Sequence, residues 1–512
     1  MKQIIKFLKS IVISMGKGVA QDPEVQKLVN SYPRFSAFIR RRFTREEARG
    51  LYLTIGSAIC GIFIYFFFEI IQDIIGQDVL VQADLRIVNL VQIFHTPSLN
   101  KIMLFITYLG NWQAVFLGVL IVCFVLFSLK QWRQLVVLLS SVIGGQIFVW
   151  VIKNIVARPR PPLVNALLPL QDYSFPSGHS FVAFSFYGLV TYFTFRSVRS
   201  KLVKTLFAAA GVIIIILIGF SRIYLGVHWP SDVLASFTIG AAWLTGFITF
   251  VEIRKKYKPK NQEVPYLKKS AIVLISGILV MGWAIYLSSY YDNHPIRPQG
   301  KIAESAMPAT KDNLVQSLFS SFPKVSENIS GEPMEPIDIV IVASQDGLEK
   351  AFKQAGWQRT DSISMGTVGK LIYASVFNKP YAGAPGIPSF WNREPNSFAF
   401  EKPTDQNTAR ERHHIHFWET AFVLSDGRRA WVATAHFDKG IDMTSGLFIP
   451  THIIDPAIDK ERDKIAQDLS NTGIMESLQQ FSMVEPTLGT NQSGNQFFTD
   501  GKADIIFLKN EI

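Results

Sequence analysis

Apolar residues fill roughly the first 290 positions of the chain in long runs separated by short polar stretches. A run of about 18 apolar residues is long enough to cross a hydrocarbon core of roughly 30 Å as a helix. The pattern predicts six or seven such spans with soft ends: Leu51 to Asp73, Trp112 to Leu129, Leu135 to Ile152, Ser180 to Phe195, Val203 to Phe220, Val233 to Val251 and Ser270 to Tyr290. This part of the chain is therefore predicted to be an all-α, polytopic membrane domain.

After about Asp292 the long apolar runs stop, and the composition becomes that of a soluble protein. Residues 291–336 contain Pro and Ser and are expected to form a loose connector. Strand-like and helix-like segments then alternate: Ile337 to Ala343, Gly347 to Ala355, His413 to Thr420, Ala430 to Phe437, Ile458 to Leu469 and Ala503 to Leu508. This alternation predicts an α/β or α+β domain over residues 337–512.

The formal net charge of +11 raises the question of nucleic acid binding, but the basic residues crowd the turns between spans. They include Arg40, Arg41, Arg42 and Arg45 before the first span, Lys130 and Arg133 after the second, and Arg196, Arg199, Lys201 and Lys204 after the fourth. If every span crosses, these turns lie on one side, and the positive-inside rule makes that side cytoplasmic. The charge is therefore a topology signal, and no nucleic acid partner is expected.

Three short polar islands interrupt the apolar sequence at residues 153–161, 176–179 and 221–232. If the N-terminus is cytoplasmic, all three lie at the same, non-cytoplasmic face of the membrane. The span assignment does not depend on these residues, so their convergence is independent support for a single site. Residues 76–111 are amphipathic, which predicts an interfacial or partly re-entrant helix covering that site, with a plain loop as the alternative.

The islands carry the residue types that phosphoryl transfer needs. Lys153, Arg160 and Arg222 are cations that can surround a phosphoryl group, whose oxygens carry the charge that a catalyst must stabilise. The planar fork of Arg grips two oxygens at once, while Lys acts as a point charge. His179 and His228 then remain as candidate acid and nucleophile.

Quoted in full, the islands read Lys153-x6-Arg160-Pro161, Pro176-Ser177-Gly178-His179 and Ser221-Arg222-x5-His228-x3-Asp232. This pattern resembles the three-part signature of the type 2 phosphatidic acid phosphatase superfamily, and the resemblance covers about Leu51 to Glu252. That superfamily includes lipid phosphate phosphatases, isoprenyl diphosphate phosphatases and vanadium haloperoxidases. The resemblance implies a six-helix core, to which the seventh span at 270–290 is an addition.

The resemblance also implies the roles of the residues. His228 would attack phosphorus to form a phosphohistidine, Asp232 would hold the other ring nitrogen, and His179 would protonate the leaving oxygen and later deprotonate water. The phosphoryl oxygens would be bound by Lys153, Arg160, Arg222, the Ser177 hydroxyl and the Gly178 backbone amide. With these cations in place, neither a metal nor another cofactor is expected. Arg158, by contrast, is interpreted as an interfacial anchor at a span end.

A phosphate pocket at the outer membrane surface favours a lipid whose headgroup reaches the pocket while its chains stay in the bilayer. We therefore expect a phosphatase of a phosphatidate-like lipid or of undecaprenyl diphosphate in a bacterial inner membrane, with the site and the tail on the periplasmic side. The alternatives are a non-catalytic lipid-phosphate scaffold that serves the tail, a vanadate-dependent haloperoxidase, and a second hydrolase in the tail.

The tail concentrates histidine between His413 and His452. The segments Arg412 to Trp418, Trp431 to Ala433 with Asp438, and Thr451 to Pro456 resemble the LssY-type C-terminal domain, which occurs behind phosphatase membrane domains in bacteria. On a strand His414 and His416 would share a face, as would His436 and Asp438. With His452, these residues are weak candidates for a metal or second phosphate site, and a polar sheet face with structural pairs to Arg412 is the simpler interpretation.

The predicted organisation has six parts. They are a leader with an amphipathic helix or weakly ordered segment near Met1 to Met15 (1–50), the catalytic membrane domain (51–252), a basic cytoplasmic linker (253–269), the seventh span (270–290), the connector (291–336) and the soluble domain (337–512).

Overall fold

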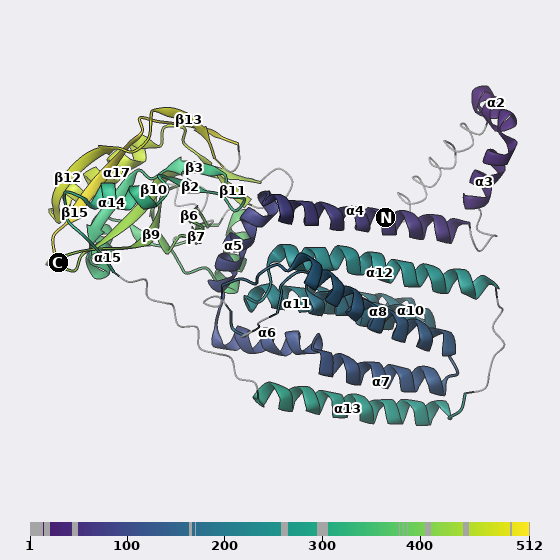
Figure 1. Cartoon of the computed structure of the whole chain (residues 1–512). Helices are drawn as coiled ribbons and strands as arrows, with labels where there is room; N and C mark the ends of the chain where they lie inside the picture. The colour runs from purple at the N-terminus through teal and green to yellow at the C-terminus, as the bar shows by residue number, and fades with distance from the viewer. Residues whose placement is uncertain are drawn as a thin grey trace.

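The computed structural model describes residues 21–43, 50–162, 166–168, 172–257, 265–293, 306–377, 379–381, 383–386, 388–404, 411–443, 450–491 and 494–510, together with residues 14 and 170. The amphipathic helix expected near Met1 to Met15 lies outside these residues, apart from residue 14. Two helices, α2 (Pro23–Ser31) and α3 (Pro33–Phe43), precede a bundle of long helices, and a strand-rich domain lies at one end of that bundle (Figure 1).

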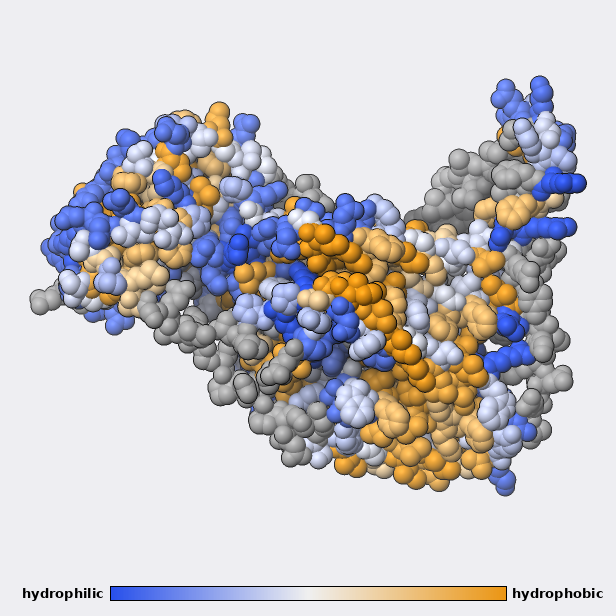
Figure 2. Space-filling view, viewed as in Figure 1, coloured by the Kyte–Doolittle hydropathy of each residue, from blue (hydrophilic) through white to orange (hydrophobic). Residues whose placement is uncertain are grey.

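The bundle is formed by the apolar runs of the sequence. Its long helices are α4 (Leu51–Gly76), α7 (Trp112–Ser128), α8 (Trp132–Val156), α11 (Lys201–Tyr224), α12 (Pro230–Tyr257) and α13 (Lys269–Asn293). Within the described part of the chain, α4, α8, α11, α12 and α13 are each long and apolar enough to cross a membrane. Figure 2 shows a broad apolar surface over the helices and a more polar one over the strand-rich domain. An apolar surface of this extent is typical of contact with lipid.

The expected fourth span is helical but not a regular α-helix. It consists of α9 (Gly178–Val182), the π-helix η2 (Ala183–Gly188) and α10 (Leu189–Ser197). Single π-helical turns within helices occur frequently at functional sites. The start of this segment packs closely on α8, because a Cβ at Gly145 would lie only 2.6 Å from the Phe181 ring. A glycine on α8 thus allows the short helix that begins with the Pro-Ser-Gly-His island to approach.

Residues 76–111 are helical, and the plain-loop alternative is wrong. They form α5 (Val79–Gln92) and α6 (Pro97–Leu109). Helix α6 meets α7 at a bend of 51°, and the two pass the length and hydropathy criteria for one span only when taken together. Helix α5 turns away from the direction of α4 and lies at the end of the bundle where the strand-rich domain sits (Figure 1).

The strand-rich domain is built on a nine-stranded sheet whose main path is β12-β15-β4-β10-β9-β8-β5, with β1 beside β9 and β11 beside β10. Its strands are β1 (Met307–Ala309), β4 (Ile339–Ala343), β5 (Gln358–Arg359), β8 (Phe398–Pro403), β9 (Arg412–Leu424), β10 (Arg429–Met443), β11 (Pro450–Ile454), β12 (Met475–Ser482) and β15 (Lys502–Leu508). Pairing is antiparallel except for β15 with β4 and β1 with β9. The predicted α/β or α+β domain is thus of the mixed, mainly antiparallel kind.

Both faces of the sheet are covered, which explains the unbroken apolar run of β4. Ile339 and Ile341 belong to one core cluster, and Val340 and Val342 belong to another on the opposite face. The first cluster is completed by α15 (Gln345–Gln354) and α17 (Asp459–Asn471), and the second by α14 (Leu314–Ser321). The domain also contains α16 (Met365–Phe377) and a pair of strands, β13 (Thr487–Thr490) and β14 (Gln496–Thr499).

The expectation of a loose connector is wrong over residues 306–336. This stretch holds β1, α14, β2 (Val325–Glu327) and β3 (Pro333–Pro336), and β2 and β3 form a small sheet with β6 (Phe390–Trp391) and β7 (Glu394–Pro395). These strands are too short to show a clear alternation in the sequence. They make the surface of the domain that meets the membrane bundle.

That surface is seated on α5. Arg86 forms an ion pair with Glu327 of β2, and the two side chains are only 4% and 16% exposed. One turn further along, the Asn89 amide donates to Glu394 Oε1 at 2.8 Å and to the carbonyl of Arg393 at 3.1 Å. The strand-rich domain is therefore joined to the bundle by a buried, directed polar contact as well as by the chain itself.

We predict that Arg86→Glu loosens this contact, because it places a second carboxylate against that of Glu327. Hydrogen exchange of the purified protein in detergent should become faster in β2 and β7 and stay unchanged in α17, which lies away from the interface. Adding Glu327→Lys should restore part of the protection. Unchanged exchange in β2 and β7 would show that the ion pair does not hold the domain in place.

Candidate active site

The structure brings the three polar islands together. Lys153 lies in the last turn of α8, Arg160 follows that helix, His179 lies at the start of α9, and Arg222 lies in the last turn of α11. His228 is on the turn between α11 and α12, and Asp232 is in the first turn of α12. All of the predicted catalytic and phosphate-binding residues therefore lie at one end of the bundle.

The His228 ring is held at both nitrogens. Its Nδ1 lies 3.3 Å from Asp232 Oδ2, and its Nε2 lies 3.1 Å from Arg160 Nη1. A guanidinium can only donate hydrogen bonds, so Nε2 must be the unprotonated, accepting nitrogen and Nδ1 must carry the hydrogen. The contacts thus select the tautomer in which the Nε2 lone pair points to the cations.

The turn that presents His228 depends on its backbone. Gly226 adopts a left-handed conformation with φ of 66°, which is open to glycine at little cost. The Trp229 backbone N–H donates to Asp232 Oδ2 at 3.0 Å, which fixes the carboxylate. His228 and Asp232 are 2% and 0% exposed. Burial, Arg160 and Arg222 together hold the pKa of the His228 ring well below its ordinary value, so the ring stays uncharged.

The cations converge beside this ring. Asp172 bridges two of them, since its carboxylate lies 2.7 Å from both Lys153 Nζ and Arg160 Nη2. The third, Arg222, is buried and donates to Thr107 Oγ1 on α6 at 2.6 Å. A carboxylate held between two cations marks a position that suits an anion. The cations were predicted from the sequence, whereas Asp172 and Thr107 were not.

The Pro-Ser-Gly-His island forms the start of α9. The Ser177 hydroxyl caps that helix, accepting from the Ser180 hydroxyl at 2.9 Å and from the Ser180 backbone N–H at 3.4 Å. Its own hydrogen remains for another acceptor. Among the described residues, a Cβ at Gly178 would contact only Val149, at 3.6 Å. The bundle therefore leaves space beside the Gly178 backbone. His179 packs against Gly110, where a Cβ would lie 3.0 Å from its Cδ2 atom.

The interpretation of Arg158 as an interfacial anchor is wrong. Its Nη2 lies 2.7 Å from Asp84 Oδ2 on α5, and its Nη1 lies 2.8 Å from Asp232 Oδ1 and 2.7 Å from Ser231 Oγ. The Arg158 side chain is only 9% exposed, and both carboxylates are almost fully buried. A charged residue such as Asp84 among apolar residues indicates a buried ion pair. The sequence alone does not identify Arg158 as the partner of this carboxylate.

The weak candidates in the tail also come together in part. His414, His416 and His436 form one buried group beside Asp438, whereas the side chain of His452 is outside those that the structure describes. Burial lowers the pKa of His414 to about 3. Burial also lowers the pKa of His436, but the hydrogen bond and charge of Asp438 outweigh it and raise that pKa to about 9. The expected pairing of Arg412 is present too, with Glu401 and Asp438.

Comparison with known proteins matches both parts of the chain. A family model described as the PAP2 superfamily matches residues 134–256, which include every predicted site residue of the bundle, and one described as the LssY C-terminus matches residues 319–503. Phosphatidylglycerophosphatase B of Bacillus subtilis (strain 168) is 35% identical over 206 residues, which are 38% of this chain and 97% of that protein. Undecaprenyl-diphosphatase of Sulfolobus acidocaldarius is 29% identical over 178 residues, which are 34% of this chain and 80% of that protein.

Among solved structures, the crystal structure of a transmembrane PAP2 type phosphatidylglycerolphosphate phosphatase from Bacillus subtilis aligns with 29% identity and a TM-score of 0.36. The alignment covers 39% of this chain and 98% of that one.

We predict that Arg158→Gln destabilises the protein by about 3 to 5 kcal/mol, the usual cost of removing one partner from a buried ion pair. The substitution leaves Asp84 and Asp232 buried without their shared cation. Denaturant unfolding in detergent measures the effect, and Arg133→Gln, at the exposed opposite end of α8, is the control. Equal stability of the two variants would restore the interpretation of Arg158 as an anchor.

Proposed function

Since this chain belongs to the PAP2 superfamily, we propose that it is a multi-pass membrane enzyme that hydrolyses a phosphomonoester or diphosphate of a membrane lipid through a phosphohistidine. The observation that carries this proposal is the His228 ring held between Asp232 and Arg160, with its unprotonated Nε2 facing a group of cations. An imidazole attacks through that nitrogen, and a carboxylate on the opposite N–H stabilises the cation that forms.

In the first step the Nε2 lone pair of His228 attacks phosphorus, and the bond from phosphorus to the leaving oxygen breaks. His179, which enters this step in its protonated form, gives a proton to that oxygen and becomes neutral, so the lipid leaves as an alcohol or as a monophosphate. In the second step His179 takes a proton from water, the water oxygen attacks phosphorus, and the phosphorus–nitrogen bond breaks. Inorganic phosphate leaves, and both histidines return to their starting states.

The phosphoryl oxygens are bound by the cations that surround the ring. The Asp172 side chain is 58% exposed, so it can move aside when a phosphoryl group enters the site. The phosphoryl group then takes the place of this carboxylate between Lys153 and Arg160. Arg222 of α11, held by Thr107 of α6, reaches the same group. These positive charges supply the stabilisation of the transition state, and the proposed reaction uses no metal ion at this site.

A lipid substrate fits the position of the site at the end of the bundle. Similar proteins are named as phosphatidylglycerophosphatase and undecaprenyl-diphosphatase. We place the site and the strand-rich domain on the periplasmic side of a bacterial inner membrane. Two features support this: the basic residues crowd the opposite turns, and the domain is seated on α5 at the same end of the bundle as the site.

We predict that His228→Ala lowers phosphate release by roughly 10³- to 10⁶-fold, as expected for loss of a nucleophile. Purified full-length protein in detergent and EDTA is assayed against phosphatidate, phosphatidylglycerophosphate and undecaprenyl diphosphate. With radiolabelled substrate, the wild type should trap acid-labile, base-stable phosphate on the protein, and His228→Ala should not. His95→Ala, in the same bundle but outside the cation group, serves as the control.

Two outcomes would contradict the proposal. Trapped phosphate that persists in His228→Ala would place the nucleophile elsewhere. A scaffold that only binds lipid phosphate would show no turnover in any variant and would lose binding when Arg222 is replaced by Ala.

We also predict a displaced pH profile. Because the pKa of His228 is lowered by burial, Arg160 and Arg222, its ring stays unprotonated at pH values where an exposed histidine is charged. The acid limb of kcat/KM, which reports the free enzyme, should therefore lie below the ordinary histidine range. In Arg222→Gln a positive charge is lost, the pKa rises, and the limb should move to higher pH. A limb that is the same in both proteins would mean that His228 is not the group observed.

A further inference from the structure

The strand-rich domain contains a second group of histidines that the proposed reaction does not use. His414 and His416 lie two residues apart on β9 and so share a face of the sheet. His436 of β10 is directly opposite His414 in the antiparallel register, and Thr434 is opposite His416. The sheet thus places the three imidazoles as neighbours along and across two paired strands.

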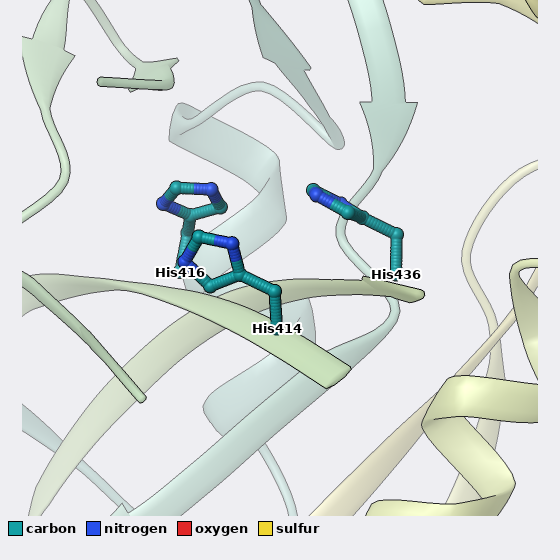
Figure 3. Close-up of side chains that lie close together, drawn as sticks. All are labelled: His414, His416 and His436. Atoms are coloured by element: carbon teal, nitrogen blue, oxygen red, sulfur yellow. The ribbon is translucent and has the colours of Figure 1, made fainter. Parts of the chain in front are cut away.

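The three rings are close together and buried. One ligand nitrogen from each ring lies within 4.8 Å of the others. The ring centroids of His414 and His416 are 4.4 Å apart. The centroid of His436 is 5.6 Å from that of His414 and 5.8 Å from that of His416. The residues are 0%, 3% and 8% exposed, in the order of their numbers. Figure 3 shows the rings gathered around a common space, two from one strand and one from the next.

The Asp438 carboxylate lies beside two of the rings. Its Oδ2 lies 3.5 Å from His414 Nδ1, and its Oδ1 lies 3.3 Å from His436 Nε2. A carboxylate beside the ring is the usual partner of a metal-bound histidine, because it accepts from one ring nitrogen while the other nitrogen binds the metal. The nitrogens on the far side of each ring from Asp438 are His414 Nε2 and His436 Nδ1, and the latter has no hydrogen-bond partner among the described residues.

The fixed charge around the rings favours a cation. Arg412 is paired with both Glu401 and Asp438, and all three side chains are at most 3% exposed. One guanidinium against two carboxylates leaves negative charge beside the imidazoles, and in a buried interior that charge repels a phosphate and attracts a metal ion. This distinguishes the cluster from the active site of the bundle, where cations prevail.

We propose that His414, His416 and His436 bind one divalent transition-metal ion of the zinc class, with Asp438 as the residue that positions two of the ligands. Imidazole nitrogen is a preferred ligand of such ions, and ligand bonds of about 2.0 to 2.1 Å require only that the rings move together from their present spacing. Three protein ligands leave a fourth position of a tetrahedral ion for water or another group.

The backbone at Gly386 closes one side of the cluster. A Cβ at this position would lie 2.4 Å from His414 Cε1, 2.7 Å from His414 Nε2 and 3.1 Å from His416 Cε1. Any side chain here would therefore collide with two of the three rings and force them out of their present positions. Gly386→Ala is predicted to exclude the metal without removing a ligand, which gives a test independent of the histidines.

The experiment measures the metal content of the full-length protein, purified in detergent with a histidine-free affinity tag and supplied with zinc. About one equivalent is expected in the wild type, and less than one tenth of that in His414→Gln, His416→Gln and Gly386→Ala. His413→Gln is the matched control, because His413 is the neighbouring histidine on the same strand and its side chain faces away to Glu461. It should keep the full equivalent.

A spectroscopic measurement covers the case in which a variant fails to fold. Cobalt added to metal-free wild-type protein should give the visible absorption of a tetrahedral site, and zinc should remove it. Each of three results would overturn the proposal. They are wild-type protein that binds no metal when zinc is supplied, histidine variants that keep their metal, and a loss of metal in His413→Gln equal to that in the other variants. Metal binding is measured without phosphatase turnover. A negative metal result therefore leaves the proposed His228 reaction standing, and a failed phosphatase assay leaves the metal proposal standing.

Discussion

Arg158 lies between the carboxylates of Asp84 and Asp232, and the polar centre of the bundle depends on that arrangement. Two buried carboxylates repel each other and are costly to remove from water, and a guanidinium that donates to both offsets this cost. Asp232 uses its remaining oxygen to hold His228, so Arg158 fixes the imidazole through its neighbour. Arg158 thus positions His228 through Asp232, and Lys153, Arg160 and Arg222 remain for the proposed phosphoryl site.

The same constraint connects the two domains. Asp84, which completes the ion pair with Arg158, belongs to α5, and two residues further along the same helix Arg86 meets Glu327 of the strand-rich domain. One short helix therefore carries a buried contact to the site and a buried contact to the domain. A displacement of the domain from α5 would act on the helix that supports Asp232. This gives the tail a physical path to the site that does not require it to touch the substrate.

The sequence predicted what is local. The long apolar runs became the bundle helices, and the spacing of the three islands identified the residues that gather at His228. It could not predict partners set by tertiary packing, such as Asp84 for Arg158, Asp172 for the cations or Thr107 for Arg222, because these pairs join segments far apart in the chain. The short strands of residues 306–336 were missed because their pairing, and not their own pattern, defines them.

Both the site in the bundle and the cluster in the tail contain buried histidines. The fixed charges around each imidazole determine which kind of group its nitrogen lone pair can bind. In the bundle, Arg160 contacts the accepting nitrogen of His228, and further cations surround it, so an electron-poor phosphorus that brings anionic oxygens is the matching partner. In the tail, Asp438 holds the rings and Arg412 is outnumbered by carboxylates, so a positive ion matches there. Under the two proposals the same ring acts as a nucleophile in one place and as a metal ligand in the other, because the charges packed around it differ in sign.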